Sequence, residues 1–220
     1  MRDKKVKSMN LQLALDRLTE ARCFEIVQQV DKYVDWIEIG TGVIKEYGIR
    51  IVAKMKEKYP DKWIVADMKT CDAGKHEALQ AFQAGADITT VMAFSEDKTI
   101  LDSLEIAQKF NKNIMVDLLG LKNRERIYEL KNMGVQLVSL HFGKDSQQQT
   151  KFNLRMFDLV KGISGLKIAV AGGIDLQSLS RILSESPYAI IIGSAITNAD
   201  NPQKVAYEMK KTMNSHTGAL

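Results

Sequence analysis

The chain has 220 residues, 45% of them hydrophobic and 26% charged; this suits one globular domain with a substantial core and argues against a disulfide-stapled or disordered chain. Its formal net charge is +4, but residues 1–8 alone carry +3, so the rest of the surface is too nearly neutral to be a nucleic-acid-binding face. No run of roughly 18 apolar residues occurs, and the two cysteines, Cys23 and Cys71, lie far apart. We therefore expect no membrane partner and a reducing, cytoplasmic location.

The basic residues 1–8 are interpreted as an N-terminal extension or tag. The apolar stretch that follows, 11–15, is short and ends at Asp16, so it does not form the apolar part of a secretion signal. A single domain is expected over residues 9–211, followed by a flexible tail over 212–220.

Eight short runs rich in β-branched and other apolar residues recur along the chain, and their starts are about 20–30 residues apart, the length of one strand plus one helix. Stretches between them, such as 78–84, 98–110 and 124–133, carry apolar residues at helical spacing. Two of these stretches precede a helix-stopping glycine, Gly85 or Gly134. In chain order the eight runs are 11–15, 36–39, 63–66, 88–92, 114–118, 137–140, 167–171 and 189–192.

Alternating strands and helices predict a parallel sheet with helices outside it. The strands are apolar almost throughout, as expected of parallel strands that are buried on both faces. Eight units of this size favour a closed (β/α)8 TIM barrel over an open doubly wound sheet. The first strand is also not followed by the G-x-G-x-x-G motif of a dinucleotide-binding fold.

Polar residues and glycines collect at or just beyond the predicted strand ends. In a barrel these ends converge on one face, where such enzymes keep their active sites. The residues concerned are Asp16, Glu38, Asp67, Lys69, Asp72, Asp117, His141, Gly172, Gly173, Gly193 and Ser194.

Glu38 interrupts an apolar strand between Ile37 and Ile39, and alternation places it on the opposite face from both. A carboxylate there is costly to bury unless it is paired or binds a metal. A structural ion pair is one interpretation. Together with Asp67, however, Glu38 could hold a hard cation such as Mg2+, which needs few carboxylates.

Lys69 lies two residues after Asp67, on the same side of an expected extended segment, and Asp72 follows in the loop. Flanking acids would keep the lysine charged and oriented to stabilise or protonate an enolate-like centre. His141 ends the sixth strand; it is either a packed residue or a proton-transfer group, and its position favours the second.

Glycines end the last two strands, at Gly172-Gly173 and at Gly193-Ser194. Glycine lets the backbone approach a ligand closely, and loops after strands 7 and 8 form the phosphate site common in barrels. Two ordinary tight turns are the alternative interpretation.

Four motifs resemble the orotidine-monophosphate-decarboxylase suprafamily, and the resemblance covers the chain from about residue 9 to about residue 210. Within the suprafamily the chain is most similar to the 3-hexulose-6-phosphate synthases, with the 3-keto-L-gulonate-6-phosphate decarboxylases as close relatives. The motifs are Leu-Gln-Leu-Ala-Leu-Asp at 11–16, Ile-Glu-Ile-Gly-Thr at 37–41, Ala-Asp-Met-Lys at 66–69 with Asp-Ala-Gly at 72–74, and Ala-Val-Ala-Gly-Gly-Ile at 169–174.

The resemblance implies an aldol reaction in which formaldehyde condenses with D-ribulose 5-phosphate to give D-arabino-hex-3-ulose 6-phosphate, and the reverse, through an enediolate. It implies Mg2+ or Mn2+ held by Glu38 and Asp67. Lys69 matches the lysine beside the developing oxyanion, and His141 the proton shuttle. The resemblance also implies a homodimer in which Asp72 is lent across the interface to the partner's site. Substrate-contacting positions match Asp16, Asp117, Gly172, Gly173, Gly193 and Ser194.

The region after the sixth strand separates the two subfamilies. Synthases tend to read His-x-Gly-x-Asp, as residues 141–145 do, whereas decarboxylases carry an arginine where this chain has Lys144. Asp117 also resembles the synthase form more than the glutamate of the decarboxylases. Residues 147–150 read Gln-Gln-Gln-Thr and depart from the Gln-Ala-x-Gly of synthases, a difference that bears on sugar specificity.

Three functions are therefore weighed. The first is the aldolase, and the second is the decarboxylase, which would release CO2 instead of formaldehyde. The third is a barrel that binds a sugar phosphate without catalysis. Loss of the candidate metal ligands Glu38 and Asp67, or of Lys69, would favour this third function, and the chain keeps all three residues.

Overall fold

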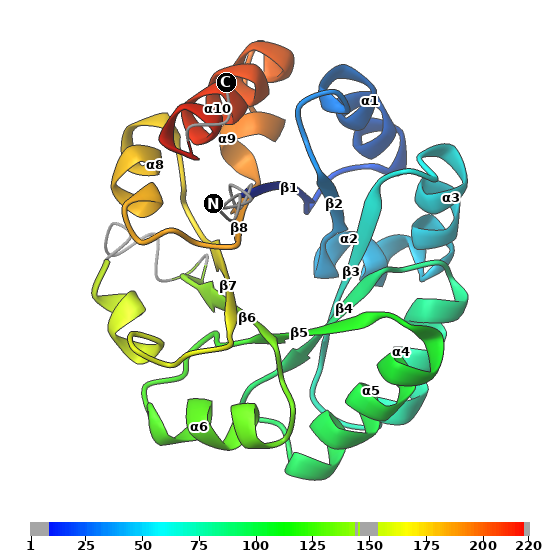
Figure 1. Cartoon of the computed structure of the whole chain (residues 1–220). Coiled ribbons are helices and arrows are strands. Elements are labelled where there is room, and N and C mark those ends of the chain that lie inside the picture. The colour runs from blue at the N-terminus through cyan, green and yellow to red at the C-terminus, as the bar shows by residue number, and fades with distance from the viewer. Residues whose placement is uncertain (1–8, 144, 146–153, 218–220) are drawn as a thin grey trace, which may run out of the picture.

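The computed structural model describes residues 9–143, 145 and 154–217. In them eight parallel strands, each paired with the next and β8 with β1, close into a barrel, and helices form an outer ring (Figure 1). The predicted (β/α)8 barrel is confirmed. The strands are β1 (Asn10–Leu15), β2 (Trp36–Ile39), β3 (Trp63–Thr70), β4 (Ile88–Met92), β5 (Asn113–Asp117), β6 (Leu137–His141), β7 (Lys167–Ala171) and β8 (Ala189–Ile192).

The helices of the described residues lie around the outside of the barrel (Figure 1), between successive strands and, for the last two, after β8. None of them is long and apolar enough to cross a membrane. They are α1 (Glu20–Val30), α2 (Thr41–Tyr47), α3 (Arg50–Lys58), α4 (Gly74–Gln83), α5 (Asp97–Phe110), α6 (Glu125–Asn132), the 3-10 helix η1 (Leu154–Leu159), α8 (Leu176–Leu183), α9 (Ser194–Thr197) and α10 (Pro202–Thr217).

The strands alternate between two packing faces. In β2, Ile37 and Ile39 belong to the core between barrel and helices, whereas Trp36 belongs to the barrel interior and Glu38 lines the cavity at its top. Glu38 therefore lies on the opposite face of the strand from Ile37 and Ile39, as predicted. The apolar part of the interior consists of Trp36, Val65, Ile88, Met115, Leu137, Ala169, Ala171, Ala189 and Ile191.

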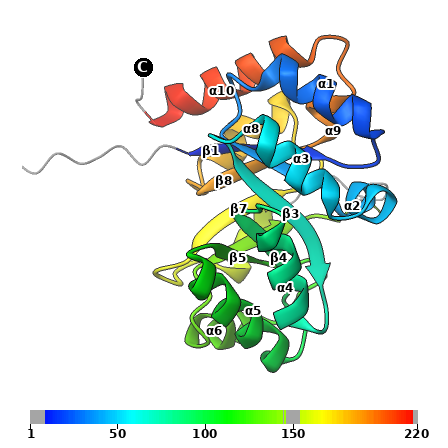
Figure 2. The same cartoon turned by 90° about the vertical axis from the view of Figure 1, so that its right-hand side faces the viewer.

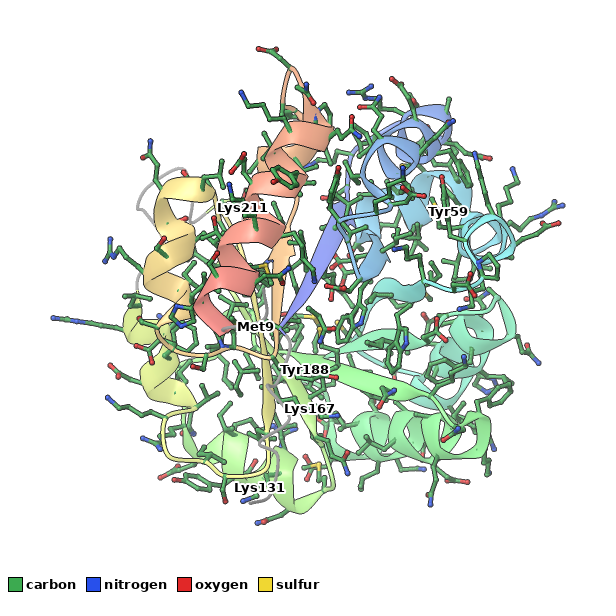
Figure 3. The ribbon with its side chains drawn as sticks, turned by 45° about the horizontal axis from the view of Figure 1, so that its top comes forward. Met9, Tyr59, Lys131, Lys167, Tyr188 and Lys211 are labelled. Carbon is green, nitrogen blue, oxygen red and sulfur yellow. The ribbon has the colours of Figure 1, made fainter. Side chains whose placement is uncertain are left out.

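Aromatic side chains gather where the strands begin. Trp36 stacks on Trp63 with ring centroids 5.6 Å apart and meets Tyr188 edge-on at 5.7 Å. Lys167 Nζ lies 5.0 Å from the Tyr188 ring centroid, and Figure 3 shows both residues near Met9. This packing closes the start of the barrel with aromatic side chains.

Strand β3 differs from its prediction, because it continues past residue 66 to Thr70 and appears as a long arrow in Figure 2. Its pairing with β4 shifts register between Ala66 and Thr70. Lys69, inside the irregular segment, has a left-handed φ of 48°, which non-glycine residues seldom adopt. The backbone at Lys69 is therefore not extended as expected, but the predicted approach of its side chain to Asp67 is observed, and the irregularity in the strand, a bulge, aims it.

The C-terminal helix also differs from its prediction. The flexible tail was expected to begin at residue 212, but α10 continues to Thr217. Met209 and Met213 are one helical turn apart, and both are buried in the core. Burial of these two thioethers stabilises the helix in a segment that was expected to be flexible.

Candidate active site

A cavity of about 620 Å³ opens at the ends of the strands. It gathers side chains from every part of the barrel, because closure brings β8 next to β1. All the predicted site residues except Asp72 line it, namely Asp16, Glu38, Asp67, Lys69, Asp117, His141, Gly172, Gly173, Gly193 and Ser194.

Lys69 lies between two carboxylates. Its Nζ is 2.6 Å from Asp67 Oδ2 and 3.4 Å from Asp117 Oδ2. Burial alone would lower the pKa of Lys69, but Asp67 and Asp117 outweigh burial and raise it. The lysine is therefore held as a cation, able to stabilise negative charge that develops on a ligand but a poor proton donor while both acids are ionised.

Asp67 is fixed by hydroxyl groups that sequence reasoning did not single out. Thr90 Oγ1 donates to Asp67 Oδ1 at 2.8 Å and accepts from the Lys69 backbone N–H at 2.9 Å. Thr41 Oγ1 lies 2.8 Å from Asp67 Oδ2 and also from the Asp67 carbonyl oxygen. The two threonines therefore hold both the carboxylate and the bulge that carries Lys69.

Asp117 and His141 form a second acid–base pair. Asp117 Oδ2 lies 2.8 Å from His141 Nδ1, and its Oδ1 accepts from the Leu119 backbone N–H at 2.8 Å. Because a carboxylate only accepts, Nδ1 carries the hydrogen and Nε2 is left to exchange a proton. Burial would lower the pKa of His141, but its bond to Asp117 raises it; burial would raise the pKa of Asp117, but His141 and Lys69 lower it.

Glu38 and Asp67 form the candidate metal site. Burial first, and then repulsion from Asp67, raise the pKa of Glu38 to about 8. Two buried carboxylates that repel each other fit a site for a divalent cation, because the positive charge of the cation relieves the repulsion. Within the described residues no group of three or more His, Cys, Asp or Glu side chains is arranged to hold a metal ion.

Asp16 is positioned by the start of α2. The Gly42 backbone N–H donates to Asp16 Oδ1 at 3.0 Å. A β-carbon at Gly42 would lie 2.7 Å from that same oxygen, so a side chain there would displace the carboxylate. The Gly-Thr-Gly turn at 40–42 therefore serves two acids at once, since Thr41 holds Asp67.

Gly172 is a position that a side chain could not occupy. Its φ is 110°, and a β-carbon would lie 2.1 Å from the Phe142 carbonyl oxygen. Gly173, Gly193 and Ser194 line the same side of the cavity. The missing side chain of Gly172 therefore allows the Phe142 backbone to approach closely.

Asp72 lies apart from the other predicted site residues. It is exposed, outside the cavity lining, and its Oδ1 accepts from the Ala73 backbone N–H at 2.7 Å. Its predicted role, in the site of a partner subunit, stays a prediction. Lys144 and residues 147–150, which bear on the choice between synthase and decarboxylase, lie outside the described residues.

The chain is similar along nearly its whole length to known proteins of about the same size. A model of the family described as orotidine 5'-phosphate decarboxylase / HUMPS matches residues 9–209. A 3-hexulose-6-phosphate synthase from Bacillus subtilis (strain 168) is 38% identical over 205 residues, which are 92% of this chain and 98% of that relative.

Solved structures agree with the sequence comparison. The crystal structure of 3-hexulose-6-phosphate synthase from Salmonella typhimurium has a TM-score of 0.92 and 33% identity, and the match covers 94% of this chain and 100% of that one. A ligand-bound crystal structure of KGPDC from Streptococcus mutans has a TM-score of 0.89 and 26% identity, with 94% and 98% covered.

Proposed function

Because this chain belongs to the orotidine 5'-phosphate decarboxylase / HUMPS family and is an enzyme of the 3-hexulose-6-phosphate synthase type, we propose that it is a lyase that condenses formaldehyde with D-ribulose 5-phosphate. The product is D-arabino-hex-3-ulose 6-phosphate, and the enzyme also catalyses the reverse cleavage. The observation that carries the proposal is the linked set Asp67, Lys69, Asp117 and His141 in one cavity. This set can stabilise an enediolate and move its proton.

The proposed cofactor is Mg2+ or Mn2+, held by Glu38 and Asp67. The support for it is that both carboxylates line the cavity, and that burial and repulsion from Asp67 raise the pKa of Glu38. When bound, the ion supplies positive charge that lowers the cost of forming an enediolate.

The side chains and backbone of the cavity carry the other steps of the proposed reaction. A proton leaves C1 of ribulose 5-phosphate, C1 forms a bond to the formaldehyde carbon, and the new alkoxide takes up a proton. The His141 Nε2 atom, oriented by Asp117, is the group that moves protons. The charged Lys69 stabilises the developing oxyanion. Asp16 binds sugar hydroxyls, and the backbone at 172–173 and 193–194 holds the phosphate.

A homodimer with shared sites belongs to the proposal. Asp72 lies outside the cavity of its own chain, which leaves it free to reach a neighbouring subunit. Phe94, which lies just beyond β4, is 64% exposed. A large apolar side chain at this end of the barrel is suited to burial in a subunit interface.

The proposed location is the cytoplasm. Cys23 and Cys71 are both free thiols in the described structure. Unpaired cysteines are typical of proteins that work in a reducing compartment.

The decarboxylation of 3-keto-L-gulonate 6-phosphate is the second candidate. The likeness to the ligand-bound KGPDC favours it, because both reactions can share one enediolate. Binding of a sugar phosphate without catalysis is disfavoured, since the acids, Lys69 and His141 are all present and linked.

The test mixes purified protein with Mg2+, D-ribulose 5-phosphate and formaldehyde, and follows formaldehyde loss. Loss that requires metal and disappears in Asp67→Asn would support the synthase. If formaldehyde is not consumed but 3-keto-L-gulonate 6-phosphate releases CO2, the enzyme is a decarboxylase. Failure of both reactions with metal supplied would leave only the binding function.

A further inference from the structure

Gln12 is a polar residue inside the apolar part of the barrel. It lies on β1, two residues before Ala14, and its side chain is completely buried. Its register partners are Trp36 on β2 and Ile191 on β8, and both belong to the apolar interior. From this layer the Gln12 amide Nε2 donates a hydrogen bond to Glu38 Oε2.

The amide of Gln12 is only half satisfied. Its Oε1 is buried and has no hydrogen-bond partner among the described residues. A buried acceptor without a partner destabilises the folded protein, because it has lost its hydrogen bonds to water. Methionine or leucine would fill a similar volume without that cost, so packing alone does not explain an amide here. The bond from Nε2 to Glu38 is the contact that a hydrophobic residue could not make.

The two carboxylates of the candidate metal site are supported very differently. Asp67 is held by Thr41, Thr90 and Lys69. For Glu38, the hydrogen-bonding partner within the described chain is Gln12. The orientation of Glu38 therefore depends on this one amide far more than the orientation of Asp67 depends on any single donor.

We propose that Gln12 is a positioning residue for the metal site. Its amide holds one oxygen of Glu38 from the interior of the barrel and leaves the other oxygen for the cation. The inference rests on the proposed function, which supplies the cation. Hydrogen bonds to ligating carboxylates set their direction, and removing such support typically lowers metal affinity by about 10–100-fold.

The test is direct Mn2+ binding to the full-length protein, followed by the electron paramagnetic resonance signal of free Mn2+. Gln12→Met removes the amide donor but keeps a long, unbranched side chain. It is expected to raise the Mn2+ Kd about 10–100-fold while its thermal unfolding stays cooperative. The matched control is Thr89→Val, which removes a buried hydroxyl bonded to the Ala66 carbonyl oxygen and is expected to leave the Kd unchanged.

A Kd for Gln12→Met within twofold of the wild-type value would overturn the proposal. So would loss of cooperative unfolding in Gln12→Met but not in Thr89→Val, because Gln12 would then be a requirement of the fold. A wild-type protein that binds no Mn2+ would instead refute the cation use in the proposed function, and the role of Gln12 would fail with it.

Discussion

At the residue scale, the site works through contacts that cross the barrel from strand to strand. Lys69 on β3 is linked to Asp117 on β5, which is linked to His141 on β6. Each group sets the charge of the next: the acids keep Lys69 protonated, and the bond to Asp117 raises the pKa of His141. The charge of each of these side chains therefore depends on the others, and a change in one is expected to alter the pKa of its neighbours.

Replacing Asp117 with Asn should lower the pKa of His141. The bond to the carboxylate raises that pKa above 6.5, and a neutral amide removes the stabilising charge. Titration of the imidazole by NMR is expected to give a value at or below 6.5 in Asp117→Asn. An unchanged pKa would show that Asp117 does not control His141. Asp102→Asn, which removes a carboxylate bonded to the exposed Lys98, is the control.

The same variant should alter how stability depends on pH. The raised pKa of His141 means that its contribution is complete below pH 6.5 and is lost as the pH rises through the folded value. The lowered pKa of Asp117 means that its contribution is present above 3.8 and is lost as the pH falls through the folded value. Urea titrations should therefore show the largest deficit of Asp117→Asn between these limits, and a deficit independent of pH would contradict the pairing.

Replacing Thr90 with Val should disturb both the bulge in β3 and the carboxylate of Asp67. The change removes a donor to Asp67 and an acceptor for the Lys69 N–H, so we expect a loss of about 1–3 kcal/mol of unfolding free energy and a lower kcat. Thr89→Val loses a hydroxyl one residue away that faces the outer core; it should be destabilised without a fall in kcat. Equal kcat values in the two variants would argue against the role of Thr90.

The charged side chains of the site and the glycines after the last two strands could be predicted from sequence, but the neutral side chains that hold the acids could not. Glu38, Asp67 and Lys69 stand out because an ionised group at a strand end is costly without a purpose. Gln12, Thr41 and Thr90 carry no charge, and their partners lie 21–26 residues away in the chain. For Gln12 and Thr90, polarity within an otherwise buried strand was the available signal, whereas Thr41 begins helix α2; only the structure shows which group each one contacts.

At the element scale, hydrophobic runs located the strands well because parallel strands are buried on both faces. The predicted runs 36–39, 88–92, 167–171 and 189–192 coincide with β2, β4, β7 and β8. The end of β3 was missed, since Asp67 and Lys69 break the apolar run there. The bulge in β3 depends on the Thr90 hydroxyl of the adjacent strand, and such a contact leaves no mark on local composition.

Asp87 joins several elements at the start of β4. Its carboxylate lies 3.0 Å from Lys56 Nζ and 2.6 Å from Lys112 Nζ, and it accepts from the Ile64 backbone N–H at 2.9 Å. Asp87→Asn keeps the shape and removes the charge. Because hydrogen bonds to charged groups contribute roughly 1.5–3 kcal/mol, we expect a loss of that order in the unfolding free energy.

The dependence of the Asp87 effect on pH has a definite sign. Burial opposes ionisation of Asp87, but the bonds from Lys112, Ile64 and Lys56 lower its pKa below 3.8. Its contribution is therefore present above 3.8 and is lost as the pH falls through the folded value. Calorimetry should show the gap in Tm between wild type and Asp87→Asn closing in acid. A gap that persists there would mean that the effect comes from packing and not from charge.

At the scale of the whole molecule, closure of the barrel converts a sequence pattern into a site. Asp16 follows the first strand and Ser194 follows the last, yet both line one cavity because β1 pairs with β8. The convergence could be predicted once eight strand–helix units were recognised. The position of Asp72 outside that cavity did not follow from its place just beyond the third strand; only the family resemblance, which assigns Asp72 to the site of a partner subunit, set it apart from the other predicted residues.

A shared site can be tested by mixing two inactive proteins. In Asp72→Asn each subunit keeps its own His141, and in His141→Asn each subunit keeps the Asp72 that it would lend. A mixed dimer has one site in which both residues are intact and one in which both are changed. After joint refolding of equal amounts, half of the dimers are mixed, so about a quarter of the wild-type activity should return if the sites are shared across a two-fold interface.

The recovered activity separates shared sites from independent ones. If Asp72 served its own subunit, every site in the mixture would carry one changed residue, and no activity would return. Phe94→Asp is the complementary variant, since a charge at this exposed apolar position should weaken the interface and abolish the recovery. Light scattering would then report a monomer. A fully active monomer would contradict site sharing altogether, because an isolated barrel holds its own Asp72 outside the cavity.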